Sequence, residues 1–392
     1  MIIGVDGRKL TSNKTGIGIY LENMLKYIIK NDDNNFYYVF SDNEININFN
    51  NDKKNIVFIK VNDLNKIFPN NQIYQPIWLN LILPKYLKKY KVDVFWGPNF
   101  LKPITFPAKK SIVTVHDLAF INAKEYHSKF HAMYLKFFLN LIFNKDINIF
   151  TVSNYSKQSI MGNFKYIESD QIAITYCSYD RNLFTGNYDS EIRNNIHTKY
   201  NLPEKYLLFV GTTTARKNLV NLLYSYEESI KKKRAICKLV VVGAKGNGLE
   251  NVKEIVKHFN LEEYVIFLGY VETEDLPYIY NMAEVFVFPS FYEGFGIPLL
   301  EAMASGTPVI SANVTSLPEV AGDAAVYINP SSPENISKGI DSLLSDELKQ
   351  NELKNNGINR VELFHWELSA NVFINKLKDI QLMEDVNENS DN

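Results

Sequence analysis

Two series of short, mostly apolar runs, separated by segments of helical period, constrain the fold of this chain more than any other feature. The first series contains seven runs, at Ile2–Asp6, Phe36–Phe40, Ile56–Val61, Val92–Trp96, Ser111–His116, Ile147–Val152 and Ala173–Cys177. The second contains six, at Tyr206–Val210, Lys238–Val242, Val265–Leu268, Val285–Phe288, Pro308–Ser311 and Ala325–Ile328. Continuous apolar runs are typical of parallel strands covered on both faces, and their alternation with helices indicates a doubly wound α/β fold. The two series predict two Rossmann-like domains.

The polar, weakly patterned stretch 181–202 separates the two series and is the best candidate for a linker. We expect an N-terminal domain over residues 1–185 and a C-terminal domain over residues 186–368, each of a usual domain length. The acidic and polar residues 382–392 are expected to form a disordered tail.

Charge and cysteine content exclude two classes of protein. The chain has 42 Lys and Arg against 44 Asp and Glu, a net charge of −2, so no basic field is available to hold nucleic acid. Two cysteines, Cys177 and Cys237, cannot form a disulfide framework or a four-thiolate zinc site. Both are expected to be buried thiols.

Targeting signals are missing from the sequence as well. The N-terminus lacks the basic and apolar regions of a secretory signal, and no run of about 18 apolar residues is long enough to span a bilayer. We therefore expect a cytoplasmic protein.

One helical segment carries an apolar stripe whose meaning is open. Its apolar residues recur at three- and four-residue spacing, at Phe130, Met133, Tyr134, Phe137, Phe138, Leu141 and Ile142. The favoured interpretation is that this stripe packs against the sheet as part of the core. The alternative is a helix that lies on a membrane surface, helped by the basic cluster Lys85, Lys88, Lys89 and Lys91.

The densest chemical signal lies at residues 286–322, where a buried strand is followed by the turn Tyr292–Pro298. Two glycines beside Phe295 allow a tight turn and a close approach to a ligand, and Pro298 suits the first position of a helix. The backbone amides of Leu299, Leu300 and Glu301 would then be unpaired at a positive helix end, which is a site for a diphosphate. Glu293 and Glu301 would flank it.

The spacing of these two glutamates, inside GFGIPLLEAMASGTPVI and followed by SLPEVA, resembles the E-x7-E signature of the GT4 family of retaining glycosyltransferases. The resemblance implies the GT-B fold, an α/β arrangement of two Rossmann-like domains with an interdomain cleft. It extends over nearly the whole chain. The further matching segments are IIGVDGRKLTSNKTGIGIYLENML at the N-terminus, HDLAF at 116–120, FVGTTTARKN at 209–218, FLGYVETEDLPYIYNMA at 267–283 and HWELSANVF at 365–373.

The resemblance implies that the C-terminal domain binds a nucleotide-sugar donor and the N-terminal domain an acceptor. Arg216 and Lys217 would bind the donor diphosphate, although Thr214-Ala215 stands where many relatives have Glu-Pro. The segment 365–373 implies a closing helix, expected over 369–381, that returns to the N-terminal domain.

The other implied site residues are divided between catalysis and binding. His116 and Glu293 would be the catalytic residues, since His116 would bind sugar or acceptor near the reacting carbon and Glu293 would orient the donor sugar. Glu301 would accept hydrogen bonds from the ribose hydroxyls. The remaining implied donor-binding residues are Gly16, Val271 (for the nucleotide base), Phe295, Gly296, Ile297, Leu299 and Leu300.

The resulting hypothesis is a retaining hexosyltransferase that uses a nucleotide diphosphate sugar, with GDP-mannose favoured over UDP-hexoses. The acceptor would be a glycan or a lipid-linked saccharide of surface polysaccharide synthesis, and a lipid-linked one would bring the enzyme to the inner face of the membrane. No Asp-x-Asp motif occurs in the sequence, so we expect no metal ion and no cofactor besides the donor. The alternatives are a GT-B-fold sugar-nucleotide epimerase and a non-catalytic sugar-nucleotide-binding subunit.

Overall fold

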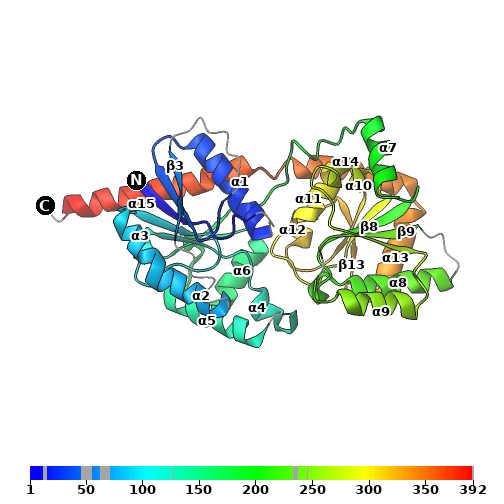
Figure 1. The fold of residues 1–392 in the computed structure, drawn as a ribbon, viewed down its shortest axis with the longest axis horizontal. Coiled ribbons are helices and arrows are strands. Elements are labelled where there is room, and N and C mark those ends of the chain that lie inside the picture. The colour runs from blue at the N-terminus through cyan, green and yellow to red at the C-terminus, as the bar shows by residue number, and fades with distance from the viewer. Residues whose placement is uncertain are drawn as a thin grey trace. The chain divides into compact units, whose positions relative to one another are not determined.

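A computed structural model of the chain describes residues 1–11, 16–45, 55–61, 71–126, 128–232, 237–244 and 246–390 (Figure 1). The chain divides into two compact units, the first formed by Met1–Cys177 with His365–Asn392 and the second by Ser178–Phe364.

The divisions fall at Cys177 and Phe364 rather than at the expected 185 and 368. The reason lies in contacts within the second unit. The Ser178 hydroxyl donates a hydrogen bond to the Phe364 carbonyl over 2.8 Å, and Arg181 forms a 2.9 Å ion pair with Glu362. These contacts tie residues 178–181 to the second unit.

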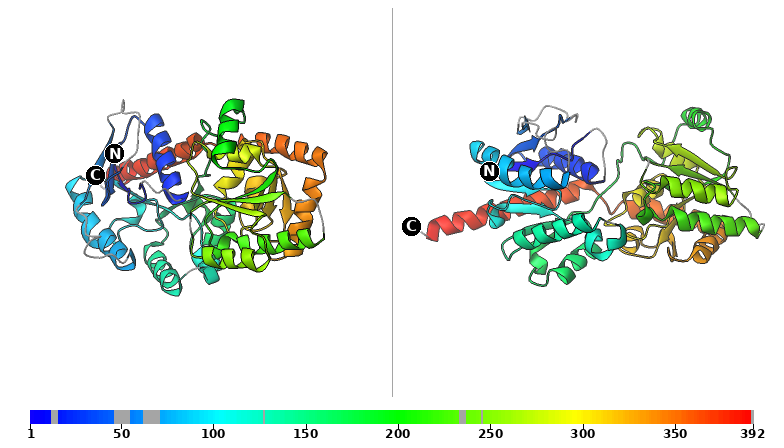
Figure 2. Two further views of the ribbon diagram at one scale, coloured as in Figure 1. Left: turned by 45° about the vertical axis from the view of Figure 1, so that its right-hand side comes forward. Right: turned by 60° about the horizontal axis from the view of Figure 1, so that its bottom comes forward.

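The described residues of the first unit form a seven-stranded sheet in the order β3-β2-β1-β4-β5-β6-β7, with every neighbouring pair parallel. The strands are β1 (Ile2–Asp6), β2 (Phe36–Ser41), β3 (Ile56–Lys60), β4 (Val94–Gly97), β5 (Ser111–Thr114), β6 (Asn148–Thr151) and β7 (Ile172–Ile174). The helices are α1 (Gly16–Asn31), α2 (Asn71–Ile77), α3 (Leu83–Lys89), α4 (Ala119–Asn122), α5 (Lys129–Ile142), α6 (Asn154–Asn163) and α15 (Trp366–Ser390). Right-handed crossovers place α1 on one face of the sheet and α2, α3, α5 and α6 on the other, and α15 packs against α1 (Figures 1 and 2).

The described residues of the second unit form a six-stranded parallel sheet in the order β10-β9-β8-β11-β12-β13. The strands are β8 (Tyr206–Val210), β9 (Lys238–Val242), β10 (Val265–Gly269), β11 (Val285–Phe288), β12 (Val309–Ala312) and β13 (Ala325–Ile328). The helices are α7 (Ser190–Lys199), α8 (Leu219–Lys231), α9 (Leu249–His258), α10 (Leu276–Met282), α11 (Ile297–Ala304), α12 (Leu317–Ala321), α13 (Pro333–Leu344) and α14 (Glu347–Val361). In Figure 1, α8, α9 and α13 cover one face of this sheet and α10, α11 and α14 the other.

The predicted fold class is confirmed strand by strand. Each apolar run named from the sequence overlaps one strand, and the bounds differ by three residues or fewer. Both cysteines are unpaired thiols, with Cys177 buried and Cys237 half-buried.

Helix α15 follows the second unit in sequence but belongs to the first. It begins before the expected residue 369 and continues to Ser390, because neither Gly nor Pro interrupts the sequence from Trp366 onward. Residues 382–390 of the expected tail are therefore helical, whereas 391 and 392 lie outside the described residues.

The inner face of α15 is anchored by Phe373. This side chain is fully buried, with ring centroids 4.6 Å from Trp96 and 5.6 Å from Phe150. Ser369 adds a 2.7 Å hydrogen bond to the Tyr176 carbonyl. The last helix of the chain thus completes the core of the first unit.

The expectation that the apolar stripe of α5 packs into the core is wrong for most of its members. Phe130, Met133, Phe137 and Leu141 are 72%, 65%, 58% and 48% exposed. The buried side of α5 is formed instead by Leu135, Leu139 and Ile142, and Tyr134 and Phe138 are half-buried between the two sides. The helix has two apolar sides, and the sheet covers one of them.

Replacing Phe373 by Ala is expected to destabilise the first unit by about 3–5 kcal/mol, since it removes a fully buried ring from the α15 contact. All three tryptophans, Trp78, Trp96 and Trp366, lie in this unit, so urea unfolding followed by tryptophan fluorescence reports on it selectively. The matched control is Leu382→Ala on the same helix, which is 62% exposed and should change stability by less than about 0.5 kcal/mol. Equal unfolding midpoints for the two variants would contradict the anchoring role.

Candidate functional site

The site of the second unit lies where the direction of the sheet reverses. Strands β8 and β11 are neighbours, but the chain continues from β8 toward β9 and from β11 toward β12, on opposite sides. Doubly wound sheets bind ligands at the carboxyl ends of two such strands. Arg216 and Lys217 follow β8, and Glu293 follows β11.

These three residues form an ion-pair cluster in which Glu293 is buried and the two cations are half-buried. The Glu293 carboxylate is held by the Arg216 guanidinium at 2.9 Å through Oε2 and by the Lys217 ammonium at 2.7 Å through Oε1. Arg216 also donates a hydrogen bond to the Tyr292 carbonyl, and Lys217 Nζ lies 4.9 Å from the centre of the Phe288 ring. Two strands are thus joined at their ends by one carboxylate between two cations.

The cluster strongly affects the protonation of Glu293. Burial by itself would raise the pKa of this carboxyl, but the positive charges of Lys217 and Arg216 outweigh burial and lower the pKa to about 2. Glu293 is therefore ionised throughout the physiological pH range.

The turn that carries the two cations is fixed by Asn218. Residues 215–217 form one turn of 3-10 helix, and Asn218 ends it in the left-handed conformation, at φ 61°. The Asn218 side-chain amide donates to the carbonyls of Pro289 and Pro330 at 2.9 and 2.8 Å. The Phe291 amide donates to the Arg216 carbonyl at 2.9 Å. The loop after β8 is thereby fastened to the loop after β11.

Ser316 and Thr315 hold the loop of Glu293 from its other side. The Ser316 hydroxyl lies 2.9 Å from the carbonyls of both Glu293 and Phe295, and the Thr315 hydroxyl accepts from the Glu293 amide at 3.2 Å. Gly296 then turns the chain into α11 with φ 114°, a conformation that favours glycine. A Cβ atom there would also lie 2.9 Å from a Leu317 methyl carbon.

Helix α11 begins at Ile297, with Pro298 in its first turn as expected. The expectation of an unpaired Leu299 amide is wrong, because this amide donates to the Gly296 carbonyl over 3.0 Å as the first turn tightens. The side chains of Leu299 and Leu300 are fully buried, so only the backbone of these two residues can meet a ligand.

Glu301 lies on α11 and is held by Tyr280 of α10. The Tyr280 hydroxyl donates to Glu301 Oε2 at 3.0 Å, and Tyr280 is completely buried. Burial raises the pKa of the Glu301 carboxyl to about 7, although the Tyr280 hydrogen bond and the Lys217 charge both act to lower it. The two glutamates of the signature therefore differ, because Glu293 is charged at any physiological pH and Glu301 titrates near neutral pH.

The other predicted residues of the second unit lie around this cluster or beyond it. Phe295 is buried against Phe364, with ring centroids 5.6 Å apart in an edge-to-face arrangement. Ile297 is half-buried at the start of α11. Val271 is buried after β10, which is the outermost strand of this sheet and is separated from β8 by β9.

His116 and Gly16 belong to the first unit. His116 follows β5, where its Nε2 donates to the Pro98 carbonyl at 2.8 Å and its ring meets Tyr20 edge-to-face at 4.9 Å. Burial lowers the pKa of His116, although the Pro98 carbonyl and Asp117 oppose this. The imidazole is thus neutral at pH 7, with Nδ1 remaining as its acceptor atom.

Gly16 is the first residue of α1, and no described atom lies within 4 Å of the position that a Cβ would occupy. Residues 12–15 of the preceding loop lie outside the described residues.

Comparison with known proteins identifies the family. The family model described as "Glycosyl transferases group 1" matches residues 192–360. The O-antigen chain mannosyltransferase B of Escherichia coli is 35% identical over 295 residues, which make up 74% of this chain and 76% of that protein. The chain belongs to the group 1 glycosyltransferases.

Two further comparisons define the extent of the likeness. The serotype-specific mannosyltransferase WbdA of E. coli is 27% identical to this glycosyltransferase over 294 residues, and the match spans 36% of that longer protein. The solved structure of WaaG, a glycosyltransferase involved in lipopolysaccharide biosynthesis, has a TM-score of 0.73 at 15% identity, covering 95% of this chain and 98% of that one. That likeness assigns the GT-B fold.

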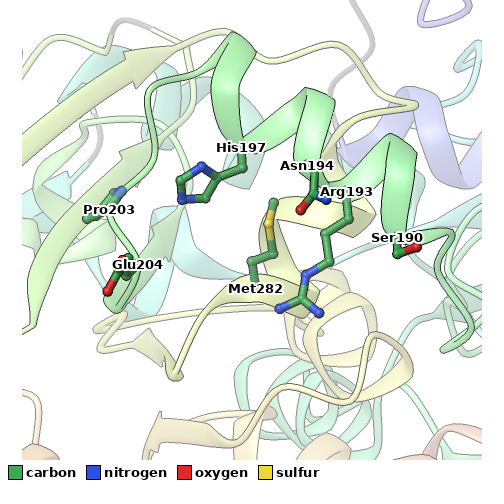
Figure 3. Close-up of a pocket in the computed structure, with 7 residues that line it drawn as sticks. All are labelled: Ser190, Arg193, Asn194, His197, Pro203, Glu204 and Met282. Atoms are coloured by element: carbon green, nitrogen blue, oxygen red, sulfur yellow. The ribbon is translucent and has the colours of Figure 1, made fainter.

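A pocket of about 280 Å³ in the second unit of this glycosyltransferase lies away from the predicted site (Figure 3). It is lined by Ser190, Arg193, Asn194, His197, Pro203, Glu204 and Met282. Pro203 and Glu204 precede β8 and Met282 precedes β11, so the pocket is at the amino ends of these strands. The ion-pair cluster occupies the carboxyl ends.

Sequence reasoning missed the residues that hold the site in place, namely Tyr280, Asn218, Thr315 and Ser316. Ser316 is the first residue of the matched segment SLPEVA, and membership of that segment was the only sequence signal that could have pointed to it. Tyr280 lies within an apolar helix, where nothing in the pattern distinguishes a hydrogen-bonded tyrosine from a core ring.

The described residues lack two features. No group of three or more His, Cys, Asp or Glu side chains in them is placed to hold a metal ion. Among the same residues, none of the helices is both long and apolar enough to cross a membrane.

The pKa of Glu293 makes the stability of the glycosyltransferase depend on pH. A carboxyl whose pKa falls from about 4.5 unfolded to about 2 folded contributes about 3 kcal/mol above pH 4.5, and this contribution is lost as the pH falls toward 2. We therefore expect Glu293→Gln to be destabilising at pH 7, with a deficit relative to the wild type that narrows steadily from pH 5 to pH 3. Urea unfolding at each pH measures it. A deficit that is the same at pH 7 and pH 3 would show that the ion pairs contribute nothing.

Proposed function

We propose that this glycosyltransferase is a retaining, metal-independent hexosyltransferase that moves mannose from GDP-mannose to a glycan or lipid-linked acceptor in surface polysaccharide synthesis. The observation that carries the proposal is the ion-pair cluster of Arg216, Lys217 and Glu293 at the carboxyl ends of β8 and β11, followed by Glu301 on α11. The choice of mannose and of a polysaccharide acceptor draws on the O-antigen chain mannosyltransferase B of E. coli, which is 35% identical.

In the proposed reaction, Arg216 and Lys217 stabilise the negative charge that develops on the departing diphosphate. A guanidinium has five N–H donors and an ammonium has three, so both side chains can bind phosphate oxygens while still holding Glu293. The cations are fixed before the donor arrives, and little reorganisation is needed when charge develops. This arrangement takes the place of a divalent metal ion.

Glu293 and Glu301 divide the remaining donor contacts. Glu293 orients the donor sugar, and its own position is set by the two cations and by Ser316. Glu301, when ionised, accepts hydrogen bonds from the two ribose hydroxyls. On the acceptor side, His116 binds sugar or acceptor near the reacting carbon through Nδ1, since its Nε2 is engaged by Pro98.

Retention follows if the acceptor approaches from the side of the leaving diphosphate. The diphosphate, held by Arg216 and Lys217, then takes the proton of the attacking hydroxyl, and no separate base is needed. A lipid-linked acceptor is held in a bilayer, so the proposal includes contact of the enzyme with the inner surface of the membrane.

The stereochemistry of the product tests this proposal. We expect GDP-α-mannose to give an α-linked product in the presence of EDTA, at a rate that added Mg²⁺ does not raise, with the anomer read from the one-bond C–H coupling constant by NMR. A β-linked product would exclude retention, and loss of transfer in EDTA with recovery in Mg²⁺ would exclude metal independence.

Two control reactions separate the alternative functions. Donor turnover without acceptor that yields free nucleotide and an altered sugar would indicate an epimerase. No turnover with any saccharide acceptor, together with tight donor binding, would indicate a non-catalytic binding subunit.

The raised pKa of Glu301 leads to a pH-dependent affinity for the donor. Because only the ionised carboxylate can accept both ribose hydroxyls, the affinity for GDP-mannose should be highest above pH 7 and fall as the pH drops through about 7. The intact nucleotide sugar is the right probe, since its diphosphate lacks the terminal phosphate proton that titrates near pH 6 in GDP. Isothermal titration between pH 6 and 8.5 measures the profile.

The matched variant is Tyr280→Phe, which removes only the hydroxyl that donates to Glu301. Since that hydrogen bond lowers the pKa of Glu301, its loss should move the affinity transition to higher pH, whereas Glu301→Ala should abolish the transition. A wild-type affinity that does not change between pH 6 and 8.5 would contradict the ribose role.

A further inference from the structure

The outer side of α5 is an exposed apolar ridge, defined here as Phe130, Met133, Phe137 and Leu141. These four side chains are between 48% and 72% exposed. Their spacing of three, four and four residues places them in one line along the helix. Single exposed apolar side chains are ordinary, but four in one line form a contiguous patch of the kind that marks an interaction surface.

The ridge belongs to a helix that is firmly attached to its unit. Leu135, Leu139 and Ile142 are each at most 4% exposed on the opposite side of α5. The ridge is therefore presented by a rigid element, and a partner can bury it without any refolding of the helix. Bringing it into an apolar phase is favourable in proportion to the apolar area covered.

The charges near the ridge favour an anionic partner. Lys129 and Lys136 are exposed and lie along one edge of the ridge, and α5 contains no acidic residue. A second copy of this chain would place like charges against each other across the same face, which disfavours self-association. An anionic lipid surface can bind both the lysines and the apolar ridge. The lysines would pair with the lipid phosphates, and the apolar side chains would lie beneath the phosphates.

A second element on the same face of the sheet repeats this chemistry. Leu81 is 62% exposed. Lys85 lies four residues after it and Lys88 three residues further on, and both lysines are exposed. This segment runs into α3, which the crossover rule places on the same side of the sheet as α5. The face thus presents apolar side chains and lysines from two helical segments.

We propose that the α5 ridge is a docking surface for an anionic bilayer, with its four apolar side chains inserted at the headgroup boundary and Lys129 and Lys136 paired with lipid phosphates. The inference deepens the proposed function and rests on it in one respect, because a lipid-linked acceptor is what makes a membrane-facing surface useful. The contact itself needs neither donor nor acceptor.

Sedimentation with lipid vesicles tests the ridge in the full-length protein. We expect the wild type to bind vesicles of phosphatidylcholine with phosphatidylglycerol, and to bind pure phosphatidylcholine vesicles much more weakly. Met133→Glu with Phe137→Glu should lower the vesicle partition coefficient at least about tenfold, the factor that corresponds to 1.4 kcal/mol of lost transfer free energy. The matched control is Leu348→Glu on α14, which is 84% exposed in the other unit and should leave binding unchanged.

The charge component has its own variant, which changes only exposed side chains. Lys129→Glu with Lys136→Glu should weaken binding to the anionic vesicles and remove its sensitivity to salt, while leaving the melting temperature unaltered. Equal vesicle binding by the wild type and both double variants, or no binding by the wild type, would overturn the proposal. A wild-type dimer in light scattering that Met133→Glu with Phe137→Glu converts to a monomer would also overturn it, in favour of a second copy as the occupant.

Because the vesicle assay contains no nucleotide sugar, its outcome is independent of the transferase reaction. Failure of the proposed function would appear as an absence of donor turnover with vesicle binding intact. Failure of the docking surface would appear as unchanged transfer to a water-soluble acceptor without vesicle binding.

Discussion

Glu293 allows two half-buried cations to lie side by side, and the rest of the site depends on that ion-pair cluster. Moving Arg216 and Lys217 even partly out of water is unfavourable, and their mutual repulsion adds to this cost. One carboxylate, at 2.9 and 2.7 Å from the two cations, offsets both terms and still leaves one net positive charge. Glu293 in turn requires the turn at Gly296 and the Ser316 hydroxyl. A site built in this way is charged and fixed in place before any ligand arrives.

The alternation of parallel strands and helices could be predicted from the sequence. Most of the parallel strands are short apolar runs because both their faces are covered, and all the described strands were found. The order of strands then places Arg216, Lys217 and Glu293 at one end of the second sheet. The family resemblance selected the same residues, but only the structure shows that they form ion pairs with one another.

The sequence could not predict features for which the same sequence pattern is compatible with either a buried or an exposed side chain, or with either a paired or an unpaired amide. The apolar residues of α5 have the periodicity of a core helix, but periodicity does not say how many sides of a helix the sheet covers. Likewise, Pro298 marks the start of α11, but it does not tell whether the Leu299 amide closes onto Gly296. The pKa of Glu301 depends on burial and on Tyr280, which is 21 residues away in sequence. These outcomes are decided by tertiary packing.

The position of α15 has a consequence for how the protein is made. The first sheet leaves a ribosome early, but Phe373, which covers Trp96 and Phe150, is translated only after the entire second unit. During synthesis the second unit therefore has its complete sequence available while the first still has an uncovered apolar face. Domains generally fold as units during translation, in the order in which they leave the ribosome. Here the first unit completes its core last, because α15 packs onto it only after the second unit has been translated. Termination between residues 364 and 372 would release a chain that contains the whole second unit but lacks the Phe373 ring that completes the core of the first.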